Sequence, residues 1–126
     1  MQNLVKSTMT QTLKKGEVWL ANLNPTKGTE AGKIRPVLVL QDQALLDVVH
    51  PSTLVAPLTT RLIEDIYPLR VRLNAKDDLK KDSDVLIDQI RAIDNKRFVK
   101  GPLITLSIEQ LVVVYDAVCE VMGMRS

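Results

Sequence analysis

The chain consists largely of short runs of aliphatic and β-branched residues that end at prolines, glycines or charged segments. Runs of about four to eight such residues are typical of β-strands. We expect strands in the segments Glu17–Leu23, Val37–Leu40, Thr53–Leu58, Leu69–Leu73 and Asp84–Ile93. Because helical segments do not alternate with them, the sequence predicts a mainly β (α+β) fold, built as a small, strongly bent antiparallel barrel or sandwich.

The expected strands differ in how they are buried. The unbroken apolar run Val37–Leu40 indicates a central strand that is covered on both faces. Pro57 lacks a ladder donor, which implies an edge strand, a bulge or a strand end at that point. In the segment Leu69–Leu73, apolar residues alternate with Arg70 and Arg72, so this strand is half exposed and one of its faces is basic.

A helix near the C-terminus is the clearest single element. Ser107 and Gln110 have the spacing of a capping box, and Gly123 supplies a stop, so we expect a helix of about four turns between them. Its main apolar stripe is Ile108, Leu111, Val112, Tyr115, Cys119 and Met122, widened by Val114, Ala117, Val118 and Val121. Cys119 has no cysteine partner in the chain and is expected to fill the core.

The apolar face of this helix is broader than a single core requires, because only Glu109, Asp116 and Glu120 interrupt the remaining arc. Such a helix either lies deep inside one domain or is covered by a second subunit. In a chain of 126 residues the second subunit is favoured, and we therefore expect a homodimer.

Length and composition set the class of protein. A chain of 126 residues fits one domain, which we assign to residues 14–126, with residues 1–13 as a flexible leader. The 45% of hydrophobic and 25% of charged residues are typical of a globular domain and not of a disordered one. No window approaches the roughly 18 apolar residues of a membrane span, and the N-terminus lacks a signal-peptide pattern. The expectation is a cytoplasmic protein without a membrane partner.

Charge alone does not identify a partner, because the net charge is only +2. The distribution is more informative, since Lys14, Lys15, Lys27, Lys33 and Arg35 make the first third locally basic. Three of these cations lie in or beside a long loop rich in proline and glycine, and long loops on small domains usually carry function. The basic region is either a phosphate-binding surface or an ordinary solvated face.

Common catalytic and metal motifs are absent from the sequence. His50 is the one histidine and precedes a proline in a predicted loop, so a serine or cysteine triad has no base. The acids Asp77, Asp78, Asp82 and Asp84 alternate with lysines, which indicates a solvated loop rather than a cation site. We therefore expect no metal and no cofactor.

Several polar residues remain near predicted strand ends, namely Glu30 in the loop, Arg35 at a strand start, and Thr59 with Thr60 at a strand end. A guanidinium can hold two phosphate oxygens at once, and a hydroxyl can add another donor. RNA supplies its own nucleophile in the 2′-hydroxyl, so such groups can act without a metal-activated water. Taken alone, Arg35 fits an ordinary surface or salt-bridge role better than a catalytic one.

Three sequence motifs together resemble those of one family. They are Gly16–Gln41 (GEVWLANLNPTKGTEAGKIRPVLVLQ), Leu54–Thr60 (LVAPLTT) and Asp88–Asp94 (DQIRAID), followed by the helix from Ser107. This combination resembles the MazF/PemK toxins of bacterial toxin–antitoxin pairs over about residues 14–124.

The resemblance implies a compact SH3-like antiparallel barrel of the MazF/PemK/CcdB type, with short helices and a C-terminal helix, that works as a homodimer. It also implies a sequence-specific, metal-independent endoribonuclease, an mRNA interferase. This class cleaves single-stranded RNA by attack of the 2′-hydroxyl to give a 2′,3′-cyclic phosphate and a 5′-hydroxyl. The implied partners are single-stranded RNA and a cognate antitoxin, with DNA bound only indirectly through the antitoxin complex.

The resemblance also implies roles for individual residues. Arg35 takes the place of a catalytic arginine that serves in proton transfer and phosphate stabilisation, and Thr59 that of a catalytic threonine. Glu30 matches a loop acid that either acts as a base or positions the loop. The expected RNA-binding residues are Lys27, Thr29, Lys33, Thr60 and Gln89.

Two alternatives remain at this stage. A CcdB-like gyrase poison has a similar barrel and dimer but lacks the pair of Arg35 and Thr59. The second alternative is a relative that binds RNA without cutting it. Trp19 is expected to pack in the core and is not assigned to the site.

Overall fold

The computed structural model describes residues 12–23 and 33–124. The predicted leader, residues 1–13, therefore lies almost wholly outside the described part of the chain. The elements in chain order are β1 (Glu17–Asn22), β2 (Ile34–Val39), α1 (Gln43–Asp47), β3 (Ser52–Thr59), β4 (Arg70–Leu73), β5 (Ser83–Leu86), the 3-10 helix η2 (Ile87–Gln89), β6 (Arg91–Asp94), the 3-10 helix η3 (Asn95–Arg97), β7 (Phe98–Thr105) and α2 (Ile108–Met122).

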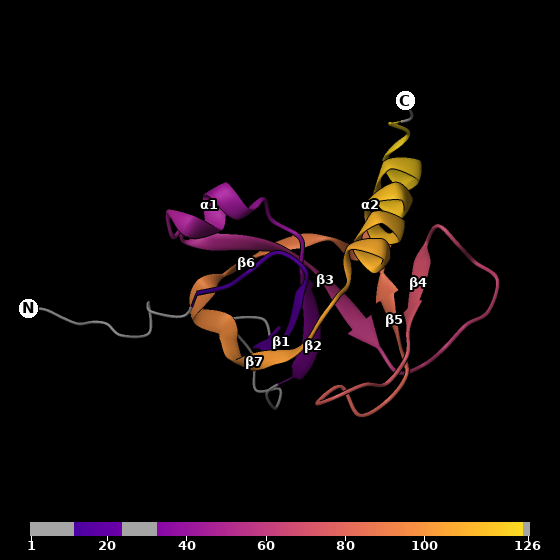
Figure 1. The fold of residues 1–126 in the computed structure, drawn as a ribbon, viewed down its shortest axis with the longest axis horizontal. Coiled ribbons are helices and arrows are strands. Elements are labelled where there is room, and N and C mark those ends of the chain that lie inside the picture. Colours follow the sequence, from indigo (N-terminus) through magenta and orange to yellow (C-terminus); the bar gives the residue numbers. More distant parts are fainter. Residues whose placement is uncertain (1–11, 24–32, 125–126) are drawn as a thin grey trace, which may run out of the picture.

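The strands form one antiparallel sheet in the order β4-β5-β3-β2-β1-β7, with β6 paired to β3 beside this path. Figure 1 shows α2 standing beside β4 and β5, and α1 near the start of β3. The expected mainly β fold with a C-terminal helix is confirmed. Within the described residues β4 and β7 end the path, so backbone hydrogen bonds do not close the sheet into a complete barrel.

Strand β3 connects the two parts of the sheet because its partners change along its length. On one side it pairs with β2, and on the other it pairs first with β6 through residues 52–55 and then with β5 through Leu58 and Thr59. Pro57 lies between the part of β3 that pairs with β6 and the part that pairs with β5. At Pro57 itself, β3 pairs with neither of these two strands. Its missing N–H therefore removes no bond to either strand, which explains how a proline fits in a central strand.

The segment Asp84–Ile93, predicted as one strand, is two strands separated by η2. That prediction is wrong for a physical reason. The apolar residues of the segment do not keep the period of two that one half-buried strand requires. The chain instead leaves β5 at Leu86, buries Ile87 in the 3-10 turn, and returns as β6 to a different part of β3.

Strand β2 is buried on both faces, as expected from the apolar run Val37–Leu40. Along β2 the side chains of Val37 and Val39 join one core cluster, while that of Leu38 joins the other. On β1, Trp19 belongs to the first cluster, where it lies edge-on to Phe98 with ring centroids 6.0 Å apart. The assignment of Trp19 to the core is confirmed.

Helix α2 has the predicted caps. The Ser107 side chain accepts a hydrogen bond from the Gln110 backbone, the Gln110 side chain accepts one from the Ser107 backbone, and Gly123 ends the helix in the left-handed conformation at φ 74°. No helix within the described residues is long and apolar enough to cross a bilayer.

The buried side of α2 differs from the predicted stripe. Val114 and Ala117 are fully buried, and the Tyr115 hydroxyl donates to the Leu40 carbonyl oxygen at 2.5 Å. Burial, with a smaller effect from Asp42, raises the pKa of Tyr115 to about 12. Cys119, expected in the core, is exposed. Apolar residues occur on almost every side of this helix. Their spacing in the sequence therefore did not show which side packs against the sheet.

Much of the predicted stripe instead lies on the outer side of α2. The exposed large apolar residues there are Ile108, Val112, Val113 and Met122. At 3.6 residues per turn, Ile108, Val112 and Met122 project from the same side of the helix, and we call these three the outer face of α2.

Candidate functional site

Arg35 and Thr59 lie on neighbouring strands at the same end of the β2–β3 pair. The antiparallel register pairs Val37 with Pro57. The pairing ends there, and Arg35, near the start of β2, and Thr59, the last residue of β3, each lie two residues beyond it at the same end of the two strands. Residues two apart along a strand share one face, so both side chains are on the face of Val37 and Pro57. The fold therefore brings together two residues that are far apart in the sequence.

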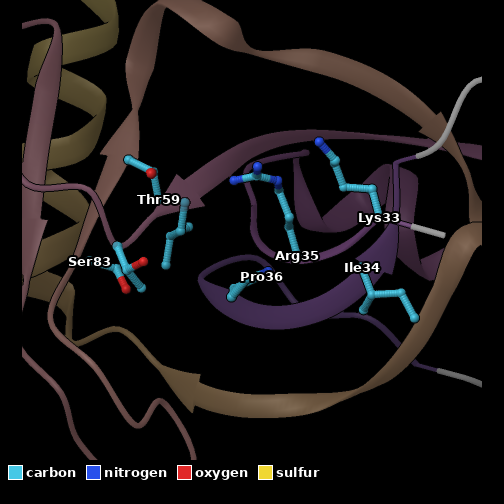
Figure 2. Close-up of a pocket in the computed structure, with 8 residues that line it drawn as sticks. Lys33, Ile34, Arg35, Pro36, Thr59 and Ser83 are labelled. Atoms are coloured by element: carbon cyan, nitrogen blue, oxygen red, sulfur yellow. The ribbon is translucent and has the colours of Figure 1, made fainter. Parts of the chain in front are cut away.

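The alternation of side chains along β2 decides which residues face this site. Figure 2 shows the side chains of Lys33 and Arg35 on the same side of the strand, whereas those of Ile34 and Pro36 point away from them. The Arg35 guanidinium points toward the end of β3, where Thr59 lies. A pocket of about 360 Å³ is lined by Lys33, Ile34, Arg35, Pro36, Leu58, Thr59, Thr60 and Ser83.

The Thr59 hydroxyl is held by the chain that follows it. Its Oγ1 accepts a hydrogen bond from the Arg61 backbone N–H at 3.1 Å. A hydroxyl can accept and donate at once, so the Thr59 O–H stays available as a donor. Thr59 is half-buried, whereas Thr60 is exposed, and both line the pocket.

The Arg35 side chain is half-buried and has no ion-pair or hydrogen-bond partner within residues 12–23 and 33–124. A guanidinium in this position keeps its donors for a ligand. Its planar shape matches two oxygens of a phosphate.

A second pocket of about 440 Å³ adjoins the first and shares Lys33, Arg35 and Thr59 with it. Its full lining is Leu23, Lys33, Arg35, Pro57, Thr59, Arg70, Leu86, Gln89 and Arg91. We call the two pockets together the strand-end groove. Four cations line it, and no aspartate or glutamate of the described chain does. The groove is thus built to attract an extended anion.

A family model for the PemK-like, MazF-like toxins of type II toxin–antitoxin systems matches residues 14–122. This chain belongs to that toxin family. Solved structures agree with the assignment. A chain of the MazE-MazF structure (Form-II) from Deinococcus radiodurans is 27% identical with a TM-score of 0.74, and the match covers 91% of this chain and 99% of that one.

Two other solved structures share the fold of this MazF-like toxin at lower identity. The Mycobacterium tuberculosis toxin MazF-mt6 is 21% identical with a TM-score of 0.71, and the match covers 87% of this chain and 99% of that one. An endoribonuclease in complex with its cognate antitoxin from Mycobacterial species is 17% identical with a TM-score of 0.68, and the match covers 93% and 99%. These similarities give no support to the CcdB-like alternative.

The residues predicted for the site of this MazF-like toxin fall into two groups. Arg35, Thr59, Lys33, Thr60 and Gln89 all line the strand-end groove. The predicted loop residues Lys27, Thr29 and Glu30 lie outside the described residues.

Sequence reasoning missed Arg70 and Arg91 as groove residues. A signal for each was present, because Arg70 lies on the basic face predicted for its strand and Arg91 lies within the DQIRAID motif.

Asp84, predicted in a solvated loop, is instead a buried residue of β5 and is 1% exposed. Its Oδ2 accepts from Arg70 Nη1 at 3.2 Å, and its Oδ1 accepts from Arg72 Nε at 2.5 Å. The prediction failed because Arg70 and Arg72 of β4 require a nearby negative charge. The pairing of β4 with β5 places the Asp84 carboxylate beside them.

Opposing effects act on the pKa of the Asp84 carboxyl. Burial raises the pKa, but the hydrogen bonds from Arg72, the Ile63 backbone and Arg70 together outweigh burial and hold it below the usual value. Asp84 is therefore ionised at neutral pH.

Proposed function

We propose that this MazF-like toxin is a metal-independent endoribonuclease that cleaves single-stranded RNA at specific sequences. The observation that carries the proposal is that Arg35 points toward Thr59 in a groove whose described lining holds four cations and no carboxylate. A guanidinium without a partner among the described residues, beside a hydroxyl that can donate, suits a phosphodiester.

The proposed reaction uses the nucleophile that RNA carries. The 2′-oxygen bonds to the adjacent phosphorus and loses its proton, the bond from phosphorus to the 5′-oxygen breaks, and that oxygen gains a proton. The products are a 2′,3′-cyclic phosphate and a 5′-hydroxyl. Because no water is added, no metal-activated hydroxide is required.

Each proposed catalytic residue has a distinct task. Arg35 binds the non-bridging oxygens, stabilises the charge that builds on them, and serves in proton transfer. Thr59 donates its hydroxyl to the same phosphate. Glu30 is the proposed base or loop-positioning acid. The proposed RNA contacts outside the reacting phosphate are Lys27, Thr29, Lys33, Thr60 and Gln89.

We propose two protein partners as well. The structure from Mycobacterial species contains a cognate antitoxin, and for this chain we propose an antitoxin whose acidic segment enters the strand-end groove and excludes RNA. The outer face of α2 leaves Ile108 77% exposed and Met122 65% exposed, which supports a homodimer through that face.

Two RNA substrates test the proposed chemistry. The first is a single-stranded RNA incubated in excess EDTA. The second is the same RNA with deoxyribose only at the cut position. We expect cleavage of the first, with a cyclic phosphate product, and no cleavage of the second because it lacks the nucleophile. Cleavage of the deoxy-substituted fragment, or loss of all activity in EDTA, contradicts the mechanism. RNA binding without any cleavage supports the alternative of a non-cutting RNA-binding relative.

A further inference from the structure

Two arginines of β4 share the buried carboxylate of Asp84 but differ in what else they reach. Arg72 donates through Nη2 to Glu64 Oε2 at 2.9 Å and to the Ile63 carbonyl oxygen at 3.4 Å. Arg70 donates through Nη1 to the Arg61 carbonyl oxygen at 2.8 Å as well as to Asp84. Together these bonds hold the segment after β3 against β4 and β5.

Only one of the two arginines faces the groove. Arg70 lines it together with Arg35, Gln89 and Arg91, whereas Arg72 is absent from its lining. Among the described residues, the side-chain hydrogen bonds of Arg70 all use Nη1, so its Nε and Nη2 keep their N–H donors for another partner. Its side chain is 18% exposed, so the arginine is largely enclosed and fixed by protein.

The sheet register sets the distance between Arg70 and the proposed reacting phosphate. Across β5, Asp84 pairs with Thr59 on one side and with Arg72 on the other, while Arg70 pairs with Leu86. Arg70 thus lies two residues along the sheet and two strands across it from Thr59, which corresponds to ~7 Å of strand rise and ~10 Å across the strands. Arg70 nevertheless lines the same pocket as Arg35 and Thr59, so an RNA strand whose reacting phosphate lies at those two residues can place a neighbouring phosphate beside Arg70.

We propose that Arg70 binds an RNA phosphate next to the one that is cut, and that the buried carboxylate of Asp84 positions Arg70 for it. This proposal rests on the proposed function and adds a second phosphate site to it. Arg70 is a binding residue, and Asp84 is a positioning residue that does not touch RNA. Binding of a neighbouring phosphate is the same before and during the reaction, so it contributes to affinity and not to the chemical step.

The test uses the salt dependence of binding to an RNA that carries deoxyribose at the cut position. Each phosphate contact on a single strand adds about 0.7 to the slope of log affinity against log salt. We expect Arg70→Ala to lower that slope by about 0.7 and to weaken binding ~10-fold, the scale of one charge-assisted hydrogen bond. Arg70→Lys should restore the slope because it keeps the charge.

Arg72→Ala is the matched control, since it removes the same charge from the same strand and from the same carboxylate. For Arg72→Ala, the slope of log affinity against log salt should equal that of the unmodified chain. Equal losses of slope in Arg70→Ala and Arg72→Ala would overturn the proposal, because general charge loss then explains both. An unchanged slope in Arg70→Ala would also overturn it.

Kinetics on cleavable RNA separate this inference from the proposed function. If the unmodified chain cuts RNA, the proposed function stands, and Arg70→Ala should raise KM ~10-fold with kcat nearly unchanged. A fall in kcat with constant KM contradicts a neighbouring-phosphate role while leaving the ribonuclease intact.

The role of Asp84 is tested by a double-variant cycle. Asp84→Asn should weaken RNA binding in the same direction as Arg70→Ala, and the double variant should bind no worse than Arg70→Ala alone. If the double variant instead loses RNA affinity by the sum of the two single losses, Asp84 does not act through Arg70. If Asp84→Asn does not fold, as judged by circular dichroism, the comparison of Arg70→Ala, Arg70→Lys and Arg72→Ala still decides the phosphate site.

Discussion

Thr59 and Asp84 lie directly opposite each other on β3 and β5, yet one lines the groove and the other is buried. The hydroxyl is bonded to the backbone of Arg61, and the carboxylate to the backbone of Ile63. Two adjacent sheet positions thus fix the same short stretch of chain after β3. The groove has a rigid wall at this point, and rigid placement is what a transition-state donor requires.

Replacing Arg35 by alanine should reduce RNA cleavage by at least ~100-fold, because one donor to the developing charge is removed. The variant should fold, since Arg35 has no partner among the described residues. Cleavage rates with saturating RNA check the effect. Lys76→Ala is the control, because Lys76 is an exposed cation away from the groove. Near-normal turnover in Arg35→Ala would remove Arg35 from the mechanism.

Thr59→Val should lower cleavage by at least ~10-fold, since it deletes one donor while keeping the side-chain shape. Thr59→Ser should retain most of the rate because it keeps the hydroxyl. Thr60→Val should cost less than Thr59→Val, since Thr60 follows the end of β3 and the Arg35 guanidinium points toward Thr59. The three kcat values measured side by side check this order. A larger loss for Thr60→Val would move the catalytic hydroxyl by one residue.

The pKa of Asp84 predicts how stability depends on pH. The folded pKa lies below the unfolded value of about 3.9, so the carboxylate stabilises the fold fully above that value. That contribution is lost as pH falls through the folded pKa. The melting temperature should therefore drop less between about pH 5 and pH 2.5 in Asp84→Asn than in the unmodified chain.

Asp78→Asn is the control for this titration, because Asp78 is an exposed acid whose contact with Lys80 is 3.8 Å long. Its melting temperature should follow that of the unmodified chain across the acid range. Parallel curves for Asp84→Asn and the unmodified chain would mean that the buried ion pair does not contribute to acid stability.

The outer face of α2 predicts the effect of a charge on the proposed homodimer. Val112 is 53% exposed in the single chain, and Val112→Glu would bury an unpaired charge in the interface. We expect dimer affinity at least ~100-fold weaker, measured by analytical ultracentrifugation. Leu45→Glu makes the same kind of change at an exposed apolar residue of α1 and should leave the dimer intact. A Val112→Glu dimer of unchanged affinity argues against this face.

The sequence predicted the elements whose signals are local. The caps of α2 follow from Ser107, Gln110 and Gly123 alone, because a capping box needs only side chains three residues apart. The ends of β2 and β3, where Arg35 and Thr59 lie, follow from short apolar runs.

Features that depend on register could not be predicted. The burial of Asp84 requires the pairing of β5 with both β3 and β4, and a charged stretch of sequence contains no sign of that pairing. Strand β7 was missed because Gly101 and Pro102 interrupt its pattern. The structure explains why position 101 is a glycine, since a Cβ there would lie 2.4 Å from a ring carbon of Trp19.

The connection between β2 and β3 contains α1 and lies at the end of that strand pair farthest from Arg35 and Thr59. In Figure 1 it leads into the start of β3, whereas the other end of β3 reaches β5. Val48 in this connection is 71% exposed, and the groove lining includes no residue of it. After Cys119→Ser removes the exposed thiol of α2, Val48→Cys offers a position for a fluorophore that reports RNA binding without obstructing it.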